Sequence, residues 1–197
     1  MQAEPGASTY PPQALNRAML EAVDYVHAEG WEAPPTLFAL VDAQLLGQLT
    51  DSPELDEDNP DAALLALVVQ ELPENILPGS EHLADYLARA IWPPAVVGAI
   101  VAQEIMFRTP QEEDAGVDAP RPARLFSGVI RGDSTELTLL QLRPTEEELA
   151  ALGPFGQDQV QLRGGDGIAP GFIAALRAGL DNEPEEDPAG GSEEGAY

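Results

Sequence analysis

Several short patterns contain residue types that could do chemistry, and each also has an ordinary structural explanation. Residues 131–134 read Arg-Gly-Asp-Ser, the sequence of an integrin-binding loop, but a Gly-Asp pair between two apolar runs is equally typical of a hairpin turn. Asp56, Asp58 and Asp61 suggest a calcium loop. The EF-hand pattern would require glycine at position 61 and glutamate at position 67, where this chain has Asp61 and Leu67. We therefore predict a turn and a solvated acidic loop, and no metal site.

The other polar candidates are equally weak as catalytic groups. His27 and His82 share no motif, and neither has a serine partner in a nucleophile elbow, which favours surface histidines. Residues 163–167 (Arg-Gly-Gly-Asp-Gly) resemble an anion-binding nest before a helix, but the lysine of a phosphate-binding loop is absent, so a flexible linker is favoured. Acid–base catalysis needs geometry that 35 scattered acids do not reveal. We predict no catalytic residue and no cofactor.

Two tryptophans remain as candidates for binding. Trp31 and Trp92 each follow a predicted helix and precede a corner that contains proline. Packing of the corner is their ordinary role, since a large aromatic ring buries much apolar surface. The alternative is a shared surface that receives a partner peptide. Trp31 and Trp92 are therefore the predicted partner surface, if there is one.

The composition limits the functions that these residues can serve. The chain has 197 residues, 44% of them hydrophobic, a net charge of −26 and no cysteine. Disulfide, zinc–thiolate and thiol chemistry are excluded. Such a charge repels phosphate backbones and anionic lipids, so neither direct nucleic-acid binding nor membrane binding is expected. The first basic residue is Arg17, which does not fit a signal peptide and favours the cytoplasm. All nine basic residues are arginines, which fits a coding bias or a halophilic host.

Hydrophobic periodicity predicts the elements of the first half of the chain. We expect helices over 13–29, 42–50 and 80–91, and strands over 36–41, 63–71 and 95–107. Residues 51–61 hold six acids and two prolines and should form a solvated loop. Residues 91–107 (IWPPAVVGAIVAQEIMF) are apolar at both alternating positions, which predicts an inner strand that is buried on both faces and leaves the core near Gln103.

The second half contains a predicted hairpin and two helices. Strands over 124–131 and 134–143 should meet at a two-residue turn, Gly132-Asp133, with Phe126 opposite Leu139 and the turn end in water. Thr145 and Glu148 form a capping box for a short helix to residue 152. A glycine-rich irregular stretch over 155–168 and a helix over 170–180 follow.

This order of elements predicts an α+β fold. We expect a mostly antiparallel five-stranded sheet with helices on both faces, in the order helix, strand, strand, helix, strand, strand, strand, helix. By analogy it is profilin-like, roadblock-like or chaperone-like. A single α+β domain should span 11–180, between a flexible N-terminus (1–10) and a disordered acidic tail (181–197).

Three groups of segments together resemble a known family. They are residues 30–41 (GWEAPPTLFALV), 91–99 (IWPPAVVGA), and 127–133 (SGVIRGD) with 139–143 (LLQLR) and 168–172 (IAPGF). The chain is similar, over about residues 13–180, to an uncharacterised family of roughly 200-residue acidic cytoplasmic proteins from actinobacteria. The resemblance implies a single domain and a host lineage. It supplies no catalytic residues.

We expect a non-catalytic cytoplasmic protein–protein interaction or adaptor module, with a protein partner or self-association. The reason is the weak chemistry of every motif together with a sheet covered on both faces, which leaves a strand edge or a helical groove as the binding surface. One alternative is an enzyme that uses carboxylate and arginine groups in an unrecognised pocket. A lower-ranked alternative is an acidic mimic of nucleic acid.

Overall fold

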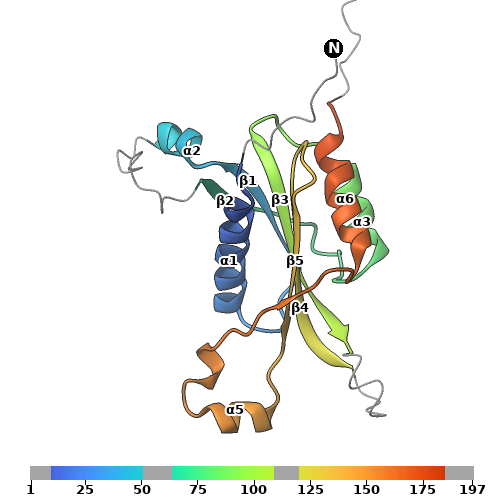
Figure 1. Ribbon diagram of the computed structural model, residues 1–197. Helices are drawn as coiled ribbons and strands as arrows, with labels where there is room; N and C mark the ends of the chain where they lie inside the picture. Colours follow the sequence, from blue (N-terminus) through green and yellow to red (C-terminus); the bar gives the residue numbers. More distant parts are fainter. Residues whose placement is uncertain (1–9, 51–63, 109–119, 185–197) are drawn as a thin grey trace, which may run out of the picture.

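The computed structural model describes residues 10–50, 64–108 and 120–184 (Figure 1). The fold class is the predicted one, an α+β protein with an open antiparallel sheet. The helices are α1 (Pro12–Glu29), α2 (Ala43–Thr50), α3 (Glu81–Arg89), α5 (Glu146–Leu152) and α6 (Pro170–Asp181), with a short 3-10 helix at Gly156–Asp158. The strands are β1 (Thr36–Asp42), β2 (Leu65–Gln70), β3 (Val96–Phe107), β4 (Arg121–Ile130), β5 (Glu136–Leu142) and β6 (Arg163–Gly164).

The sheet has six strands in the order β2-β1-β3-β4-β5-β6, and every neighbouring pair is antiparallel. The prediction of five strands was wrong by one. β6 pairs only through Gly164 opposite Leu139 and Arg163 opposite Leu140. A two-residue strand in a glycine-rich segment has no periodicity, so the sequence pattern could not reveal it. β3 lies inside the sheet between β1 and β4, as predicted.

One face of the sheet is covered by α1. Proline opens this helix at its first turn, where a missing backbone N–H costs nothing, and its apolar stripe faces the strands. Gly128 on β4 allows the close approach, because a Cβ there would meet the Met19 side chain at 2.7 Å. The buried core of this face consists mainly of Leu15, Met19, Val23, Phe38, Leu40, Ile100 and Phe126.

The opposite face is covered by α3 and α6, which lie side by side (Figure 1). Ser80 caps α3 by accepting a hydrogen bond from the Leu83 N–H at 3.1 Å. α3 ends at Arg89, two residues before the predicted end, and Ala90 has extended backbone angles ahead of the Trp-Pro-Pro corner. The core of this face includes Leu83, Leu87, Trp92, Ala99, Val101, Val129, Phe172 and Leu176.

The β4–β5 hairpin has the predicted register, with Phe126 opposite Leu139 and Gly128 opposite Leu137. Gly132 has a φ of +70°, as its place in a tight two-residue turn requires. The turn end is exposed at Gly132 and Ser134, as predicted, but the turn is also tied to a helix, which was not predicted. Arg177 of α6 donates hydrogen bonds to the backbone carbonyls of Asp133 and Ser134 and forms an ion pair with Glu136 at 2.9 Å.

β3 leaves the core directly after Gln103, close to the predicted position. The Gln103 side chain is buried, and its Oε1 accepts a hydrogen bond from the Gly79 N–H at 2.6 Å. The loop before α3 therefore covers a position that looked like the start of the exposed end. β4 begins at Arg121, three residues earlier than predicted. The predicted acidic loop over 51–61 and most of the predicted tail lie outside the described residues.

Candidate functional site

A cluster of arginines gathers where α1 ends and the sheet continues. The Arg124 guanidinium stacks on the Trp31 ring at 4.0 Å from its centroid, and that of Arg143 lies at 5.5 Å. Arg124 is opposite Glu104 on β3 and opposite Gln141 on β5. Because residues opposite one another share a face, these three side chains lie together on the α1 face of the sheet. We call Trp31, Glu104, Arg124, Gln141 and Arg143 the arginine corner.

The loop that carries Trp31 is fixed in place by Glu104. Its Oε1 accepts hydrogen bonds from the backbone N–H groups of Glu32 at 2.7 Å and Ala33 at 3.3 Å. Glu32 has a φ of +67°, an unfavourable left-handed backbone for a residue with a side chain. Contact with the Glu104 carboxylate compensates this strain, and the loop folds Trp31 over Arg124.

Arg124 is an unusual residue for its position in the sheet. It is 1% exposed, and only its Nη1 finds a side-chain partner, Gln141 Oε1 at 3.3 Å. Its Nε and Nη2 have no hydrogen-bond partner among the described residues. Burial lowers the pKa of Arg124; the nearby Glu104 opposes this effect and Arg143 adds to it. An arginine is charged at any physiological pH, so a positive charge is held in the interior with two donor groups unused.

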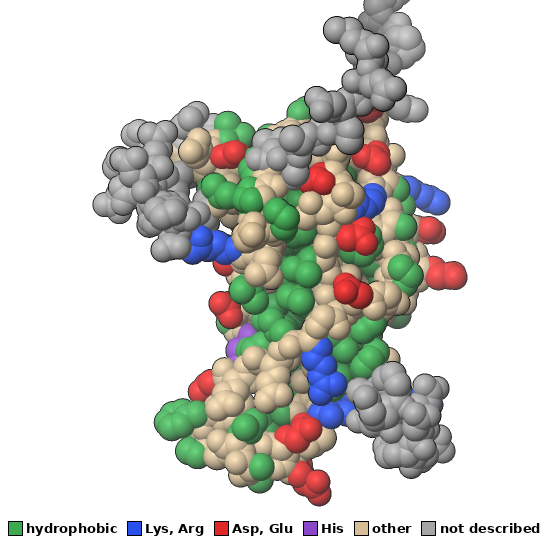
Figure 2. All heavy atoms as spheres, in the orientation of Figure 1, with side chains coloured by type: hydrophobic (Ala, Val, Ile, Leu, Met, Phe, Trp, Pro, Cys, Tyr) green, Lys and Arg blue, Asp and Glu red, His purple; other side chains and the backbone are tan. Residues whose placement is uncertain are grey.

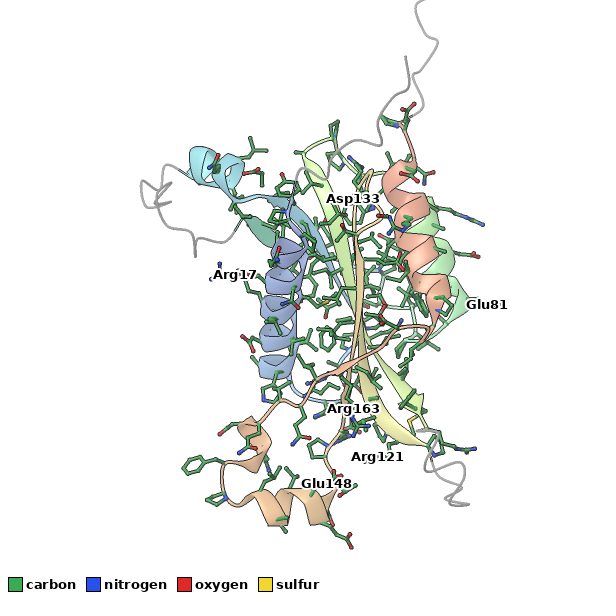
Figure 3. The ribbon with its side chains drawn as sticks, viewed as in Figure 1. Arg17, Glu81, Arg121, Asp133, Glu148 and Arg163 are labelled. Carbon is green, nitrogen blue, oxygen red and sulfur yellow. The ribbon has the colours of Figure 1, made fainter. Side chains whose placement is uncertain are left out.

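A cavity of about 240 Å³ lies beside this corner, between α5 and the edge of β5. Figure 2 shows arginine side chains (blue, since the chain has no lysine) between the α5 segment and the body of the molecule. Arg121 and Glu148 form an ion pair of 2.8 Å at its rim, and both lie with Arg163 at the α5 end of the sheet (Figure 3). The cavity is lined by Arg121, Gln141, Leu142, Pro144, Glu148, Ala151, Leu152, Gln159, Gln161 and Arg163.

The position of Glu148 follows from the capping box at the start of α5. The Thr145 hydroxyl accepts a hydrogen bond from the Glu148 N–H at 3.2 Å, and the Glu148 carboxylate accepts one from the Thr145 N–H at 2.9 Å. The Thr145 backbone and then Arg121 hold the pKa of Glu148 below its usual range, despite some opposing desolvation. The predicted box is confirmed, and it also fixes one wall of the cavity.

A second hollow, of about 440 Å³, lies near the opposite edge of the sheet, between α3 and the end of β2. It is lined by Leu37, Gln70, Glu71, His82, Asp85, Tyr86, Arg89, Ala90, Ile91, Trp92 and Pro93. β2 is the terminal strand on this side. Val68 is 37% exposed and Val69 46% exposed, and the Val68 carbonyl accepts a hydrogen bond from the Gln70 side chain at 3.1 Å. We call this strand edge and hollow the β2 groove.

The two predicted tryptophans are not brought together. Trp31 lies over Arg124, near the middle of β4 and the Glu104 end of β3. Trp92 precedes the opposite end of β3, where it is buried between α3 and α6 and its carbonyl accepts a hydrogen bond from Arg131 at 3.2 Å. The two tryptophans therefore belong to different sites. Trp31 covers Arg124 in the arginine corner, and Trp92 lines the β2 groove.

The other sequence motifs have structural roles wherever they fall within the described residues. In the Arg-Gly-Asp-Ser turn, Asp133 accepts hydrogen bonds from the Thr135 N–H and hydroxyl, and Arg131 donates to the Pro93 and Trp92 carbonyls. His82 is exposed and His27 half-buried. The first two residues of the glycine-rich segment 163–167 form strand β6, not the expected linker, and the Gly165 N–H donates a hydrogen bond to the Thr138 carbonyl at 2.8 Å. In the described ranges no three metal-binding side chains gather closely enough to hold an ion, and the aspartates at 56, 58 and 61 lie outside them.

Sequence reasoning missed Arg124 and Gln141 as site residues. A signal was present in the correct hairpin register, which puts Arg124 on the same face as Phe126 and Ile130. An arginine on a core face needs an explanation. The cavity beside it depends on α5, β6 and the end of β5 meeting in space, which no local pattern encodes.

These features define an α+β protein on an open antiparallel sheet. The arginine corner lies at one end of the sheet, and β2 is its terminal strand among the described residues. The chain belongs to the family of PPA1309-like proteins, whose model matches residues 15–181. Comparisons with curated proteins and with solved structures gave no match. Within the described residues, no helix has the length and apolar character to cross a bilayer.

Proposed function

We propose that the protein is a non-catalytic interaction module that receives an extended, basic segment of a partner protein along the outer edge of β2, which pairs with no other described strand. The observation that carries the proposal is the exposed edge itself. Natural sheets protect such edges with charges, prolines or bulges, because an unpaired strand recruits other strands. β2 has the sequence LALVVQ, which contains none of these protections, and exposes Val68 and Val69.

The β2 groove supplies the other half of this interface. An added strand gains affinity from main-chain hydrogen bonds and specificity from pockets for alternate side chains. Val68 is opposite Ala39 and therefore lies on the groove side of the sheet, next to Gln70. The hydrogen bond from Gln70 to the Val68 carbonyl is one that a partner strand can replace. The hollow then accepts a side chain of the bound segment.

The basic character of the partner follows from charge. The chain carries a net charge of −26, and Glu71 and Asp85 both line the groove. Complementary charge accelerates encounter and rejects acidic competitors. As the sequence resemblance implies, the proposed setting is the cytoplasm of an actinobacterium, and the partner is a protein of that compartment.

Site-directed photo-crosslinking in the native host tests this function. A photoreactive amino acid replaces Val69 in one variant and Leu20, on the outer side of α1, in a control, because their exposures of 46% and 43% are closely matched. We expect one discrete cross-linked protein from position 69 and none from position 20. Val68→Lys, which adds a positive charge to the edge, should abolish that product while the circular dichroism spectrum stays unchanged.

Two results would contradict the proposal. One is equal labelling from both positions, which means non-specific contact. The other is a product that consists of two copies of this chain, which assigns the edge to self-association instead of a basic partner. Light scattering of the purified chain distinguishes a stable dimer from a monomer.

A further inference from the structure

We propose that the cavity between α5 and β5 binds a small organic anion, a carboxylate or a phosphate ester, with its charged group at Arg163 and its apolar body against Leu142, Pro144 and Leu152. This site lies at the opposite side of the sheet from the β2 groove, so it is independent of the proposed partner interface. Arg163 supplies the positive charge for the anionic group of the ligand, and the three apolar side chains supply a surface for its body.

The cavity exists because β6 is short and covers only part of the edge of β5. β6 pairs only with Leu139 and Leu140, so Gln141 and Leu142 extend past it along the edge of β5. Residues 159–163 and α5 enclose this edge instead of pairing with it. The result is a small hollow with a polar floor at Gln141 and an apolar side at Leu142 and Leu152. Small-molecule sites combine apolar walls with a few fixed polar groups in this way.

The free charge of the cavity is positive. Its lining contains two arginines and one glutamate, and the glutamate is already used by Arg121 and by the Thr145 N–H. Arg121 also donates to the Arg143 carbonyl at 2.8 Å. The Arg163 side chain is exposed and has no hydrogen bond or ion pair within the part of the chain that the structure describes. It is therefore the cation available to a ligand.

Arg124 lies directly behind the floor and reinforces the selectivity for anions. Gln141 lines the cavity and accepts a hydrogen bond from Arg124, so the amide is polarised toward donating its own N–H groups to a ligand. A buried charge acts through a low dielectric and is screened little by salt. The overall charge of the chain is negative, which repels anions. A local group of arginines is the arrangement that still captures one.

Ligands that share one ring and differ in their charged group test the site. Binding of benzoate, phenyl phosphate, benzyl alcohol and inorganic phosphate to the full chain is followed by amide and side-chain chemical shifts in NMR titrations. We expect benzoate or phenyl phosphate to shift the side-chain amides of Gln141, Gln159 and Gln161, and the stronger of the two identifies the charged group. Benzyl alcohol and inorganic phosphate should each bind at least about tenfold more weakly, because each lacks one half of the ligand.

Three variants connect the binding to named residues. Arg163→Gln should weaken the anion about tenfold, since it removes one charge-assisted contact from an exposed side chain. Arg17→Gln removes another exposed arginine, on α1, that lines neither hollow, and it should leave binding unchanged. Arg124→Met keeps the volume and removes the charge behind Gln141, and it should weaken the anion several-fold without unfolding the chain.

Three outcomes would overturn the site. Benzyl alcohol binding as well as benzoate means an apolar hollow without charge selection. Equal affinity of the native chain and Arg163→Gln means that the ligand lies elsewhere. No shift of the three glutamines at about 10 mM benzoate or phenyl phosphate, well above a millimolar dissociation constant, means no site.

Discussion

Arg124 holds a charge where a hydrophobic side chain would serve the fold better. Removal of one partner from a buried ion pair is costly, but replacement of a buried charged group by an apolar one of similar volume is often neutral or stabilising. Arg124 also leaves two donor atoms without partners in the described structure, and each unmet buried donor costs stability. The residue is therefore better explained by what it does at the cavity than by what it contributes to folding.

We predict that Arg124→Met leaves the free energy of unfolding unchanged or raises it by about 1 kcal/mol. Methionine fills the space and stacks on Trp31, and it has no unpaired donor. Urea denaturation followed by fluorescence measures the change. Phe126→Ala, two residues along the same face, should lower the free energy by about 3–5 kcal/mol and shows that the method detects losses. A loss above about 1 kcal/mol for Arg124→Met would show that the charge stabilises the fold.

Glu148 gives the capping box a pH dependence. Its pKa is lowered in the folded chain, so it contributes stability above the unfolded value of about 4.3 and loses that contribution as pH falls through the folded value. Glu148→Gln should lower stability by only about 0.5 kcal/mol at pH 7, because the side chain is half exposed. The difference between the melting temperatures of the native chain and the variant should shrink as the pH falls from about 4.3 to strongly acidic values. A difference that persists there would contradict the linkage, and Glu147→Gln is the control within the same turn.

At the scale of elements, the contact between α3 and α6 depends on Gly179. A Cβ at this position would collide with the Leu87 carbonyl of α3 and approach the Trp92 ring nitrogen at 3.4 Å. The backbone carbonyl cannot move as a flexible side chain can. The absence of a side chain therefore sets how closely the two helices pack over the sheet.

We predict that Gly179→Ala destabilises the fold by about 1–3 kcal/mol, the usual cost of overpacking, although alanine is the better helix former. Gly171→Ala in the first turn of the same helix meets nothing within 4 Å and should be neutral or stabilising by up to about 1 kcal/mol. Thermal melts of both variants measure the contrast. Equal changes in the two melting temperatures would mean that helix propensity, and not the α3–α6 contact, determines the stability of both variants.

The sequence pattern predicted those elements whose evidence is local. α1, β1 and β3 follow from periodicity, and the hairpin register follows from a Gly-Asp turn, because residues close in the chain determine each of them. The details that the pattern did not predict involve distant contacts. Gln103 is buried under a loop whose Gly79 lies 24 residues earlier in the chain, and the hairpin turn is held by Arg177, more than 40 residues later. The candidate sites are of this second kind, since only assembly brings Trp31 over Arg124.

At the scale of the molecule, charge is the dominant property. All nine arginines lie in the described residues, while the acidic runs of 51–61 and 185–194 lie outside them. A net charge of −26 opposes compaction, because like charges are closer together in the folded chain. Salt shortens the range of this repulsion to about 10 Å at 0.1 M.

We predict that the melting temperature rises by several degrees between about 10 mM and 0.5 M sodium chloride, as screening weakens the repulsion. Tetramethylammonium chloride at equal ionic strength should give the same rise if the effect is screening alone. A melting temperature that falls with salt would show that ion pairs such as Arg121–Glu148 outweigh the repulsion. A rise with sodium alone would indicate specific cation binding.

The position of α6 in the chain has a consequence for synthesis on the ribosome. α6 covers the face of β3 and β4, yet it follows every strand in the sequence. While residues 170–181 are still inside the exit tunnel, α3 is the only described helix that can cover Val101 and Val129. The nascent sheet therefore presents a partly uncovered apolar face at a late stage of translation, when it is most exposed to aggregation or to chaperones. The hydrogen bonds from Arg177 to the hairpin turn are then among the last to form, and they complete the fold.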